Sequence, residues 1–305
     1  MKGKKIVSTL LALLLLASLP VSALAAEWDI SKGDITVNAG SGGQTVTQGG
    51  GAAVEDNAPV IKGSSAENTV TINAEKDQTA NVTIEDVNID MSVAGKAAVS
   101  TTGEGNVSIE LNGDNTLKSG KGHAGLEKKN GGSLTIADED KNGKLTAEGG
   151  KYGAGIGGGD QGAGSGITIT GGEIKATGGQ YGAGIGGGKG DGSDITISGG
   201  KVGATNGLNG AGIGGGQHGS GSNITISGGE VNAIGGDWSA GIGGGVYGKG
   251  EGITVSGNAQ LKVRGGSVHG DYGTGAGIGG GGSYGTDGAE VEPDICALKP
   301  GGKIE

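Results

Sequence analysis

Apolar and polar residues alternate along short stretches of this chain. In Ile167–Thr170 and again in Glu173–Thr177 every second residue is apolar, and a Gly-Gly pair follows each stretch. A third piece, Gly153–Ile156, places Ala154 and Ile156 on one face and only glycine on the other. Alternation with a period of two indicates half-buried strands. An apolar series of period 3.6 is missing, and each paired glycine costs a helix about 1 kcal/mol, so the pattern predicts three short strands per unit.

The same unit returns at a nearly constant distance. The heptapeptide Gly-Ala-Gly-Ile-Gly-Gly-Gly starts at Gly153, Gly182, Gly210, Ser239 (with one change) and Gly275, so the starts lie 29, 28, 29 and 36 residues apart. Such a period indicates a solenoid, in which each unit buries its apolar face only against its neighbours. We therefore predict an all-β fold, a single-stranded parallel β-helix (β-solenoid) with three short strands per coil of about 29 residues.

Equivalent positions of successive coils predict three apolar ladders inside the tube, because a residue one period later lies directly above its counterpart. The ladders are Ile169, Ile197, Ile226 and Val255; Ile156, Ile185, Ile213, Ile242 and Ile278; and Ile174, Val202, Val231 and Leu261. A weaker upstream pattern adds Val82–Ile84, Val107–Ile109 and Leu134–Ile136 to the first strand, Leu126 to the second ladder, and Leu117 and Leu145 to the third. We therefore expect about seven or eight coils.

The first 25 residues have the pattern of a secretory signal peptide. Lys2, Lys4 and Lys5 precede an almost wholly apolar run, and Ala23–Ala25 offers the small residues of a cleavage site. The run is too short and too close to the N-terminus to predict a membrane span. We therefore expect a secreted, extracellular protein with no membrane span, and association with the cell surface stays open.

Changes in the pattern divide the rest of the chain. We expect an N-terminal cap and first turn in 26–60, the parallel β-helix in 61–285, and a C-terminal cap or tail in 286–305. A solenoid needs covered ends because exposed edge strands promote aggregation. The last segment holds Cys296, the only cysteine, so a disulfide within the chain is excluded and pairing between chains stays open.

Composition by itself would indicate a different class of protein. The 305 residues include 77 glycines and no phenylalanine, which without a period would suggest disorder. The net charge is −10, and removal of 1–25, which holds three lysines and no acid, makes it −13. Because nucleic acids and anionic membranes require basic surfaces, we expect neither as a partner. Calcium would suit the acidic charge, but no motif supports it, and we expect no cofactor.

The repeated phrases resemble a known group of proteins. The motif Gly-Ala-Gly-Ile-Gly-Gly-Gly, followed by Ile-Thr-Ile-Ser/Thr-Gly-Gly, is similar to Gly-rich repeats in parallel β-helix proteins of Gram-positive bacterial surfaces, which look like adhesins and carbohydrate-binding domains. The segment Trp28–Val37 also resembles the start of those domains. The resemblance covers roughly residues 27–285 and implies a β-helix that binds surfaces or glycans, but it transfers no binding residue.

The sequence contains no recognisable reaction centre. The acidic residues of the repeats share neither one repeat position nor one coil: Asp160, Glu173, Asp191, Asp194, Glu230, Asp237 and Glu251. Glycosidases need two close carboxylates. The histidines show no metal-ligand spacing: His123, His218 and His269. Asp138–Asp140 reads as a solvated loop, with a calcium-holding insertion as the alternative. We predict no catalytic residue and no metal ligand.

Aromatic residues do recur beside the glycine corners. Tyr152, Tyr181 and Trp238 each precede a repeat start, and Tyr247 follows a Gly-Gly-Gly corner. The neighbouring glycine face has no side chains, so the rings would border a flat strip of backbone on which sugar rings could stack. We call these four residues the aromatic strip and predict that they bind the ligand. The alternative is that the rings only cover backbone.

The favoured hypothesis is therefore an exported, non-catalytic β-helix that binds polysaccharide or a cell or matrix surface, like an adhesin. Two alternatives stay open: a polysaccharide lyase or hydrolase on the same fold, and a structural spacer or self-assembling surface protein. Outward-facing threonines could also order ice, but exposed strands prefer threonine in any case, so ice binding is not favoured: Thr168, Thr196, Thr225 and Thr254.

Overall fold

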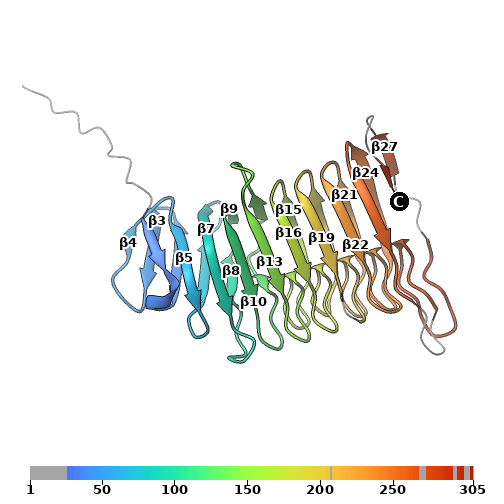
Figure 1. Cartoon of the computed structure of the whole chain (residues 1–305), viewed down its shortest axis with the longest axis horizontal. Helices are drawn as coiled ribbons and strands as arrows, with labels where there is room; N and C mark the ends of the chain where they lie inside the picture. Colours follow the sequence, from blue (N-terminus) through green and yellow to red (C-terminus); the bar gives the residue numbers. More distant parts are fainter. Residues whose placement is uncertain (1–25, 207, 268–272, 291–293, 299–302, 305) are drawn as a thin grey trace, which may run out of the picture.

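The chain winds into a rod of stacked coils in the computed structural model (Figure 1). The rod is an all-β parallel β-solenoid of about eight turns, with about 29 residues per turn, which confirms the predicted fold class. The predicted signal peptide and His269 lie outside the residues that the structure describes: 26–206, 208–267, 273–290, 294–298 and 303–304.

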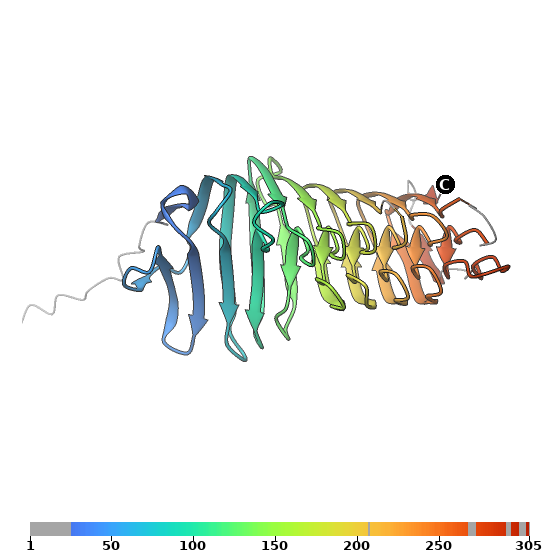
Figure 2. The ribbon, with the colours of Figure 1, turned by 90° about the horizontal axis from the view of Figure 1, so that it is seen from below.

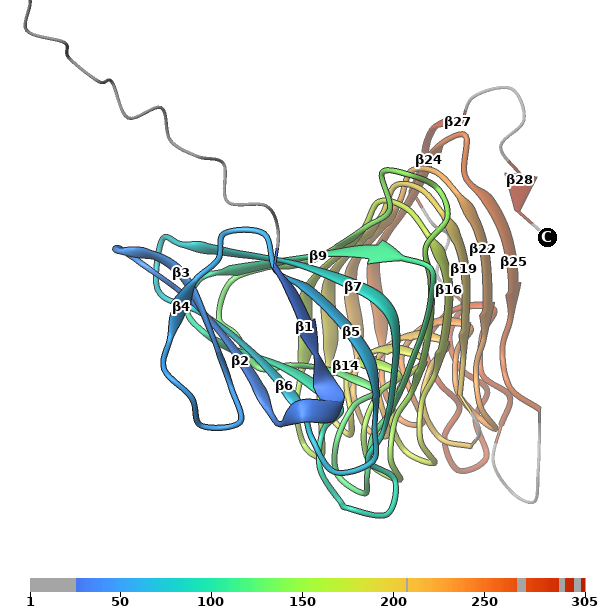
Figure 3. The same ribbon diagram turned by 60° about the vertical axis from the view of Figure 1, so that its left-hand side comes forward.

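Three strands per coil form three sides, and each strand pairs in parallel with its counterpart in the next coil (Figure 3). The first side comprises β9 (Asn106–Asn112), β12 (Leu134–Ala137), β15 (Gly164–Ile169), β18 (Gly192–Ile197), β21 (Gly221–Ile226), β24 (Gly250–Gly257) and β27 (Asp294–Leu298). The second side comprises β10 (Asp114–Lys118), β13 (Lys144–Glu148), β16 (Glu173–Thr177), β19 (Lys201–Thr205), β22 (Glu230–Ile234), β25 (Gln260–Arg264) and β28 (Lys303–Ile304).

The third side carries the shortest strands. It comprises β2 (Ile35–Gly40), β6 (Val70–Ala74), β8 (Val99–Gly103), β11 (Leu126–Lys128), β14 (Ile156–Gly157), β17 (Ile185–Gly186), β20 (Ile213–Gly214), β23 (Ile242–Gly243) and β26 (Ile278–Gly279). From β14 onward each of these strands has only two residues, and the coils of this glycine-rich half are narrower than those of the N-terminal half (Figure 2).

The N-terminal coils differ from the rest. β7 (Thr79–Asp90) is one long strand that pairs with both β9 and β10, and β5 (Val60–Ser65) pairs along it. Before them lie β1 (Glu27–Asp29), the 3-10 helix η1 (Ile30–Lys32), β3 (Gly43–Gln48) and β4 (Val54–Glu55). β2, β3 and β4 form an antiparallel sheet at this end, and the Trp28 indole donates a 2.8 Å hydrogen bond to Asp56. At the other end β27 and β28 extend the parallel ladders past residue 285.

The three predicted ladders are confirmed. Ile169 pairs with Ile197, Ile197 with Ile226, and Ile226 with Val255, and all four are fully buried. The isoleucines from Ile156 to Ile278 pair in the same way on the third side. Aliphatic side chains stacked at each rung form one continuous core, which is what stabilises a rod with so few aromatic residues.

Two upstream registers differ from the prediction. Leu117 lies opposite Ala147, so it belongs to the ladder of Ala176, and Asn115 takes the place opposite Leu145. On the first strand, Val82 lies opposite Ile109 and not Val107, a slip of two residues. Both errors keep the correct face, because side chains alternate with period two and a slip of two leaves every apolar residue inside.

Candidate functional site

Two recurring positions lie on one edge of the solenoid: the residue before each repeat start, and the turn after the Gly-Gly-Gly corner. The carbonyl oxygen of Tyr181 accepts a 2.7 Å hydrogen bond from the Gln217 amide in the next coil. The carbonyl oxygen of Trp238 likewise accepts a 2.6 Å bond from the Gly282 amide. The residue before a repeat start therefore lies against the turn that follows the Gly-Gly-Gly corner of the next coil. The four residues of the aromatic strip all occupy these two positions.

Tyr152 and Tyr181 stack on each other. Their ring centroids are 5.3 Å apart, and the ring planes differ by 11°. This spacing follows from the fold, because neighbouring coils are separated by one strand spacing of about 4.8 Å. Each tyrosine therefore uses one face of its ring for the other, and both side chains are half-buried. Less ring surface is open for stacking on a sugar than a flat row of exposed rings would offer.

Three lysines surround this tyrosine pair. The Nζ atoms of Lys121, Lys151 and Lys189 lie 5.6, 5.3 and 5.4 Å from the centroid of the Tyr152 ring, and that of Lys151 lies 5.6 Å from the centroid of Tyr181. Sequence reasoning missed them because they come from three different coils. Lys151 directly precedes Tyr152, which was the one local signal available.

A second aromatic pair lies further along the edge. His218 stacks on Tyr247 with centroids 5.1 Å apart and ring planes 8° apart. His218 occupies the same repeat position as Tyr247, one coil earlier, and the structure places the two rings together. Tyr247 is 46% exposed and borders a hollow of about 430 Å³, which Lys249 and Glu251 also line.

Trp238 belongs to the second group rather than to a continuous row. Its carbonyl oxygen bonds the Gly282 amide, and the Tyr247 amide donates a 3.1 Å bond to the Gly282 carbonyl, so the two aromatic residues share one backbone partner. Asn209, only 6% exposed, takes the equivalent position between Tyr181 and Trp238. The predicted strip is therefore two aromatic groups separated by a buried asparagine.

The backbone of the second group is strained. His218, Trp238 and Tyr247 have φ values of +66°, +61° and +65°. Bulky residues rarely adopt this left-handed region, and each such residue costs of order 1–3 kcal/mol. Glycine adopts positive φ without steric cost, so a glycine at any of these three positions would form the turn with less strain. Strained positions of this kind concentrate at functional sites.

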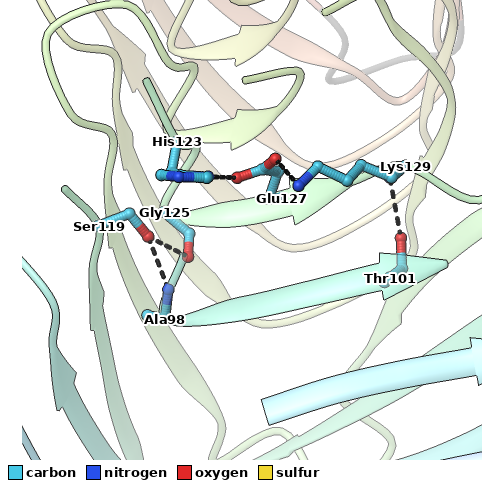
Figure 4. Close-up of polar contacts among 7 residues, drawn as sticks. All are labelled: Ala98, Thr101, Ser119, His123, Gly125, Glu127 and Lys129. Atoms are coloured by element: carbon cyan, nitrogen blue, oxygen red, sulfur yellow. Dashed lines mark hydrogen bonds and ion pairs between the residues drawn. The ribbon is translucent and has the colours of Figure 1, made fainter. Parts of the chain in front are cut away.

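A buried polar cluster lies where the glycine-rich half begins (Figure 4). Glu127 occupies the register position of Gly157 and is 1% exposed. Its carboxylate accepts from the Lys129 ammonium at 2.5 Å and lies 2.6 Å from Nδ1 of His123. Lys129 and His123 together occupy this carboxylate, which suits a structural role better than proton transfer to a ligand.

Lys128, beside Glu127, points to backbone carbonyls. Its ammonium group donates to the oxygens of Asn130 and Gly132 at 2.8 and 2.7 Å. Burial lowers its pKa to about 8. Lys128 and Glu127 thus fill a part of the coil that glycines occupy in later coils, and sequence reasoning missed both. Their position after the Ala-Gly-Leu phrase, where later repeats have Gly-Gly, was the available signal.

The acidic residues have structural partners of their own. Asp138 accepts from the amides of Asn142 and Gly143, both at 3.1 Å, and so closes its own loop. Burial, together with nearby carboxylates of that loop, raises the pKa of Glu110, which accepts a hydrogen bond from the Glu139 amide. Across the described ranges no three His, Cys, Asp or Glu side chains are placed to hold a metal ion.

Comparison with known proteins agrees with the fold. Four segments of the chain match the model of a family described as Beta helix repeat: residues 141–160, 167–189, 195–217 and 224–246. No curated protein and no solved structure matches the chain significantly. The protein is thus a parallel β-helix protein, and this fold is consistent with either a surface-binding or an enzymatic protein. In the part of the chain that the structure describes, no helix is long and apolar enough to cross a membrane.

Proposed function

We propose that this protein is an exported, non-catalytic β-helix that binds polysaccharide through the aromatic strip, in the manner of an adhesin. The observation that carries the proposal is the concentration of ring pairs on one edge: Tyr152 with Tyr181, and His218 with Tyr247, with Trp238 beside the second pair.

The rod geometry supports a polymeric ligand. The two aromatic groups lie on different coils of the same edge, so a chain-like molecule could contact both, whereas a small molecule would reach only one. A pre-formed edge of strands needs no ordering on binding, and this lowers the entropic cost of association. A longer polysaccharide would span more coils and contact more of these aromatic residues, and its affinity would rise accordingly.

The proposal is tested by retention on immobilised polysaccharides and by a glycan array. A variant with Tyr152, Tyr181 and Trp238 replaced by alanine should lose at least tenfold in affinity, at roughly 1 kcal/mol per aromatic contact. The matched control replaces three outward threonines of another side, Thr168, Thr196 and Thr225, by alanine and should bind normally. Absence of binding to any glycan, or an equal loss in both variants, would refute the proposal.

Export and surface association form part of the same proposal. The charged start, apolar run and small-residue site of 1–25 support cleavage by signal peptidase. Sequencing of the N-terminus of protein recovered from culture medium or cell envelope should begin near Ala26. Recovery of the uncleaved chain from the cytoplasm alone would contradict export.

A further inference from the structure

We infer that the polysaccharide is anionic, and that its carboxylate or sulfate groups are bound by Lys121, Lys151 and Lys189. We call these residues the lysine trio. The inference rests on the proposed function, because it assigns a ligand class to the same edge. It starts from an observation that the aromatic strip leaves unexplained, namely why three ammonium groups gather around one tyrosine ring.

The lysine trio concentrates positive charge. All three Nζ atoms lie within 5.6 Å of the same ring centroid, so no two of them are more than about 11 Å apart. Like charges at such distances repel, and the attraction of each ammonium to the ring face is small when both are exposed to water. A bound anion would offset the repulsion between the ammonium groups, which persists while no anion is bound.

The trio has no ion pairs of its own, a property that it shares with Lys76, Lys175 and Lys262 among the described residues; it differs from them because its members gather around one ring. Lys62, Lys118, Lys129 and Lys144 each lie within 4.0 Å of a carboxylate. No such ion pair is found for Lys121, Lys151 or Lys189 among the described residues, although the chain carries 32 acidic against 22 basic residues. In so acidic a protein, three neighbouring lysines without carboxylate partners mark a surface left available for an external anion.

Acidic groups in the same coils do not cancel the charge of the trio. Glu127, in the preceding coil, is engaged by Lys129 and His123. Asp160 follows the Gly-Gly-Gly corner of the Tyr152 coil, and its amide donates a hydrogen bond to the carbonyl of Gly122. Asp191 follows Lys189 by two residues and accepts a 2.7 Å hydrogen bond from the Ser220 amide, so these two aspartates stand against three lysines. Charges further along the rod are screened, because the Debye length is about 8 Å at physiological ionic strength.

The ring stacking points to the same ligand class. Since Tyr152 and Tyr181 use their faces on each other, apolar stacking on a neutral sugar has little surface at this end of the strip. At this end the ammonium groups of the lysine trio are therefore the groups available to a ligand. At the other end, the more exposed Tyr247 beside its hollow remains suited to a sugar ring. A polysaccharide with acidic groups satisfies both ends, because it carries sugar rings for Tyr247 and anionic groups for the lysine trio.

The test compares charged and neutral forms of the same polymers. The probes are polygalacturonate with its fully methyl-esterified form, and dextran sulfate with dextran, and they separate carboxylate from sulfate recognition. The protein should bind at least one acidic form at least tenfold more tightly than its neutral counterpart, with affinity falling as salt is raised. The variant K121Q/K151Q/K189Q should lose this preference and its salt dependence. The control variant K76Q/K175Q/K262Q, with the same change in net charge on other surfaces, should keep both.

The possible outcomes separate this inference from the proposed function. Equal binding of acidic and neutral forms through the aromatic strip would overturn the anionic ligand and leave polysaccharide binding intact. Binding to no polysaccharide of either kind would overturn both. Equal or tighter binding to duplex DNA, or to vesicles containing phosphatidylserine, would overturn the assignment to polysaccharide. Loss of the preference in the control variant as well would show that net charge, and not the lysine trio, is responsible.

Discussion

At the residue scale, glycine at the third-side strands sets how closely the coils approach. Gly157, Gly186 and Gly214 have φ values of +136°, +129° and +129°. A Cβ atom on any of them would lie 2.0–2.1 Å from a carbonyl oxygen of the next coil. Both the backbone conformation and the space therefore demand glycine here, which explains why the heptapeptide recurs with so little change.

The first prediction compares two glycines. Gly214→Ala should lower the free energy of unfolding by more than about 3 kcal/mol, since it combines positive φ with a backbone clash. Gly203→Ala should change it by less than about 0.5 kcal/mol, because a Cβ there would lie 3.7 Å from its nearest neighbour and φ is not positive. Chemical denaturation of both variants measures the difference, and similar losses would contradict this account of the corner.

Buried Lys128 makes stability depend on pH. Burial lowers its pKa from 10.5 to about 8 in the folded protein. Between these two values the unfolded chain binds more protons than the folded chain, so the contribution of Lys128 to stability rises as pH rises from 8 to 10.5. Below pH 8 the folded protein carries the full cost of a buried charge.

The second prediction follows from this increase in stability with pH. Relative to Lys128→Met, the wild-type protein should gain up to about 3 kcal/mol of stability between pH 8 and pH 10.5. Denaturant unfolding of both proteins at several pH values measures the difference, and taking the difference removes the titration of other lysines and tyrosines. Parallel pH profiles would mean that Lys128 keeps its ordinary pKa.

At the element scale, the strands of the second side are aligned by charge as well as by their apolar ladder. The register places Asp114, Lys144, Glu173, Lys201 and Glu230 one above another, so that charges alternate in sign. Asp114 and Lys144 approach to 3.1 Å. Directly opposed charges on neighbouring strands contribute a few tenths of a kcal/mol to about 1 kcal/mol each. If a strand shifted its register by one residue, its apolar side chains would face solvent. Shifts of other lengths would bring like charges opposite each other, so the charge ladder makes those registers less stable as well.

The third prediction reverses one charge. Lys201→Glu should destabilise the protein by about 1 kcal/mol, because it creates three acidic groups in consecutive coils, and salt should reduce the loss. Lys175→Glu is the control, since its register partners Thr146 and Gly203 are uncharged. Thermal unfolding at low and high salt compares the two. Equal effects of both substitutions would show that net charge alone matters.

At the scale of the whole molecule, each coil contacts only its neighbours, so the rod behaves as a one-dimensional stack. Removing one complete repeat should leave every ladder continuous. Deletion of 182–209 joins Tyr181 directly to Gly210, the next repeat start, and brings Ile169 against Ile226.

The fourth prediction is that this in-phase deletion folds cooperatively into a rod shorter by about 4.8 Å. Deletion of 182–195, about half a repeat, should not, because the following strands would then present the wrong residues to each ladder. Circular dichroism with thermal unfolding tests folding, and small-angle X-ray scattering tests length. A folded product from the half-repeat deletion would contradict the stacking of equivalent positions.

The sequence by itself determined the solenoid, the three strands per coil and the three apolar ladders of the glycine-rich half. These follow from local alternation and from a constant period, both of which can be read without knowing which residues touch. The register of the upstream coils was less accessible, as Leu117 and Val82 show, because their repeat lengths vary and a slip of two residues preserves the apolar face.

Only the tertiary structure decided the composition of the candidate site. The pairing of His218 with Tyr247, the separation of the strip into two groups by Asn209, and the gathering of the lysine trio around Tyr152 all arise between coils. Residues about 30 positions apart come within a few ångströms at an edge whose turns vary in length and in backbone conformation. Periodicity specifies which residues share a rung, but the directions of their side chains at those turns depend on the folded backbone.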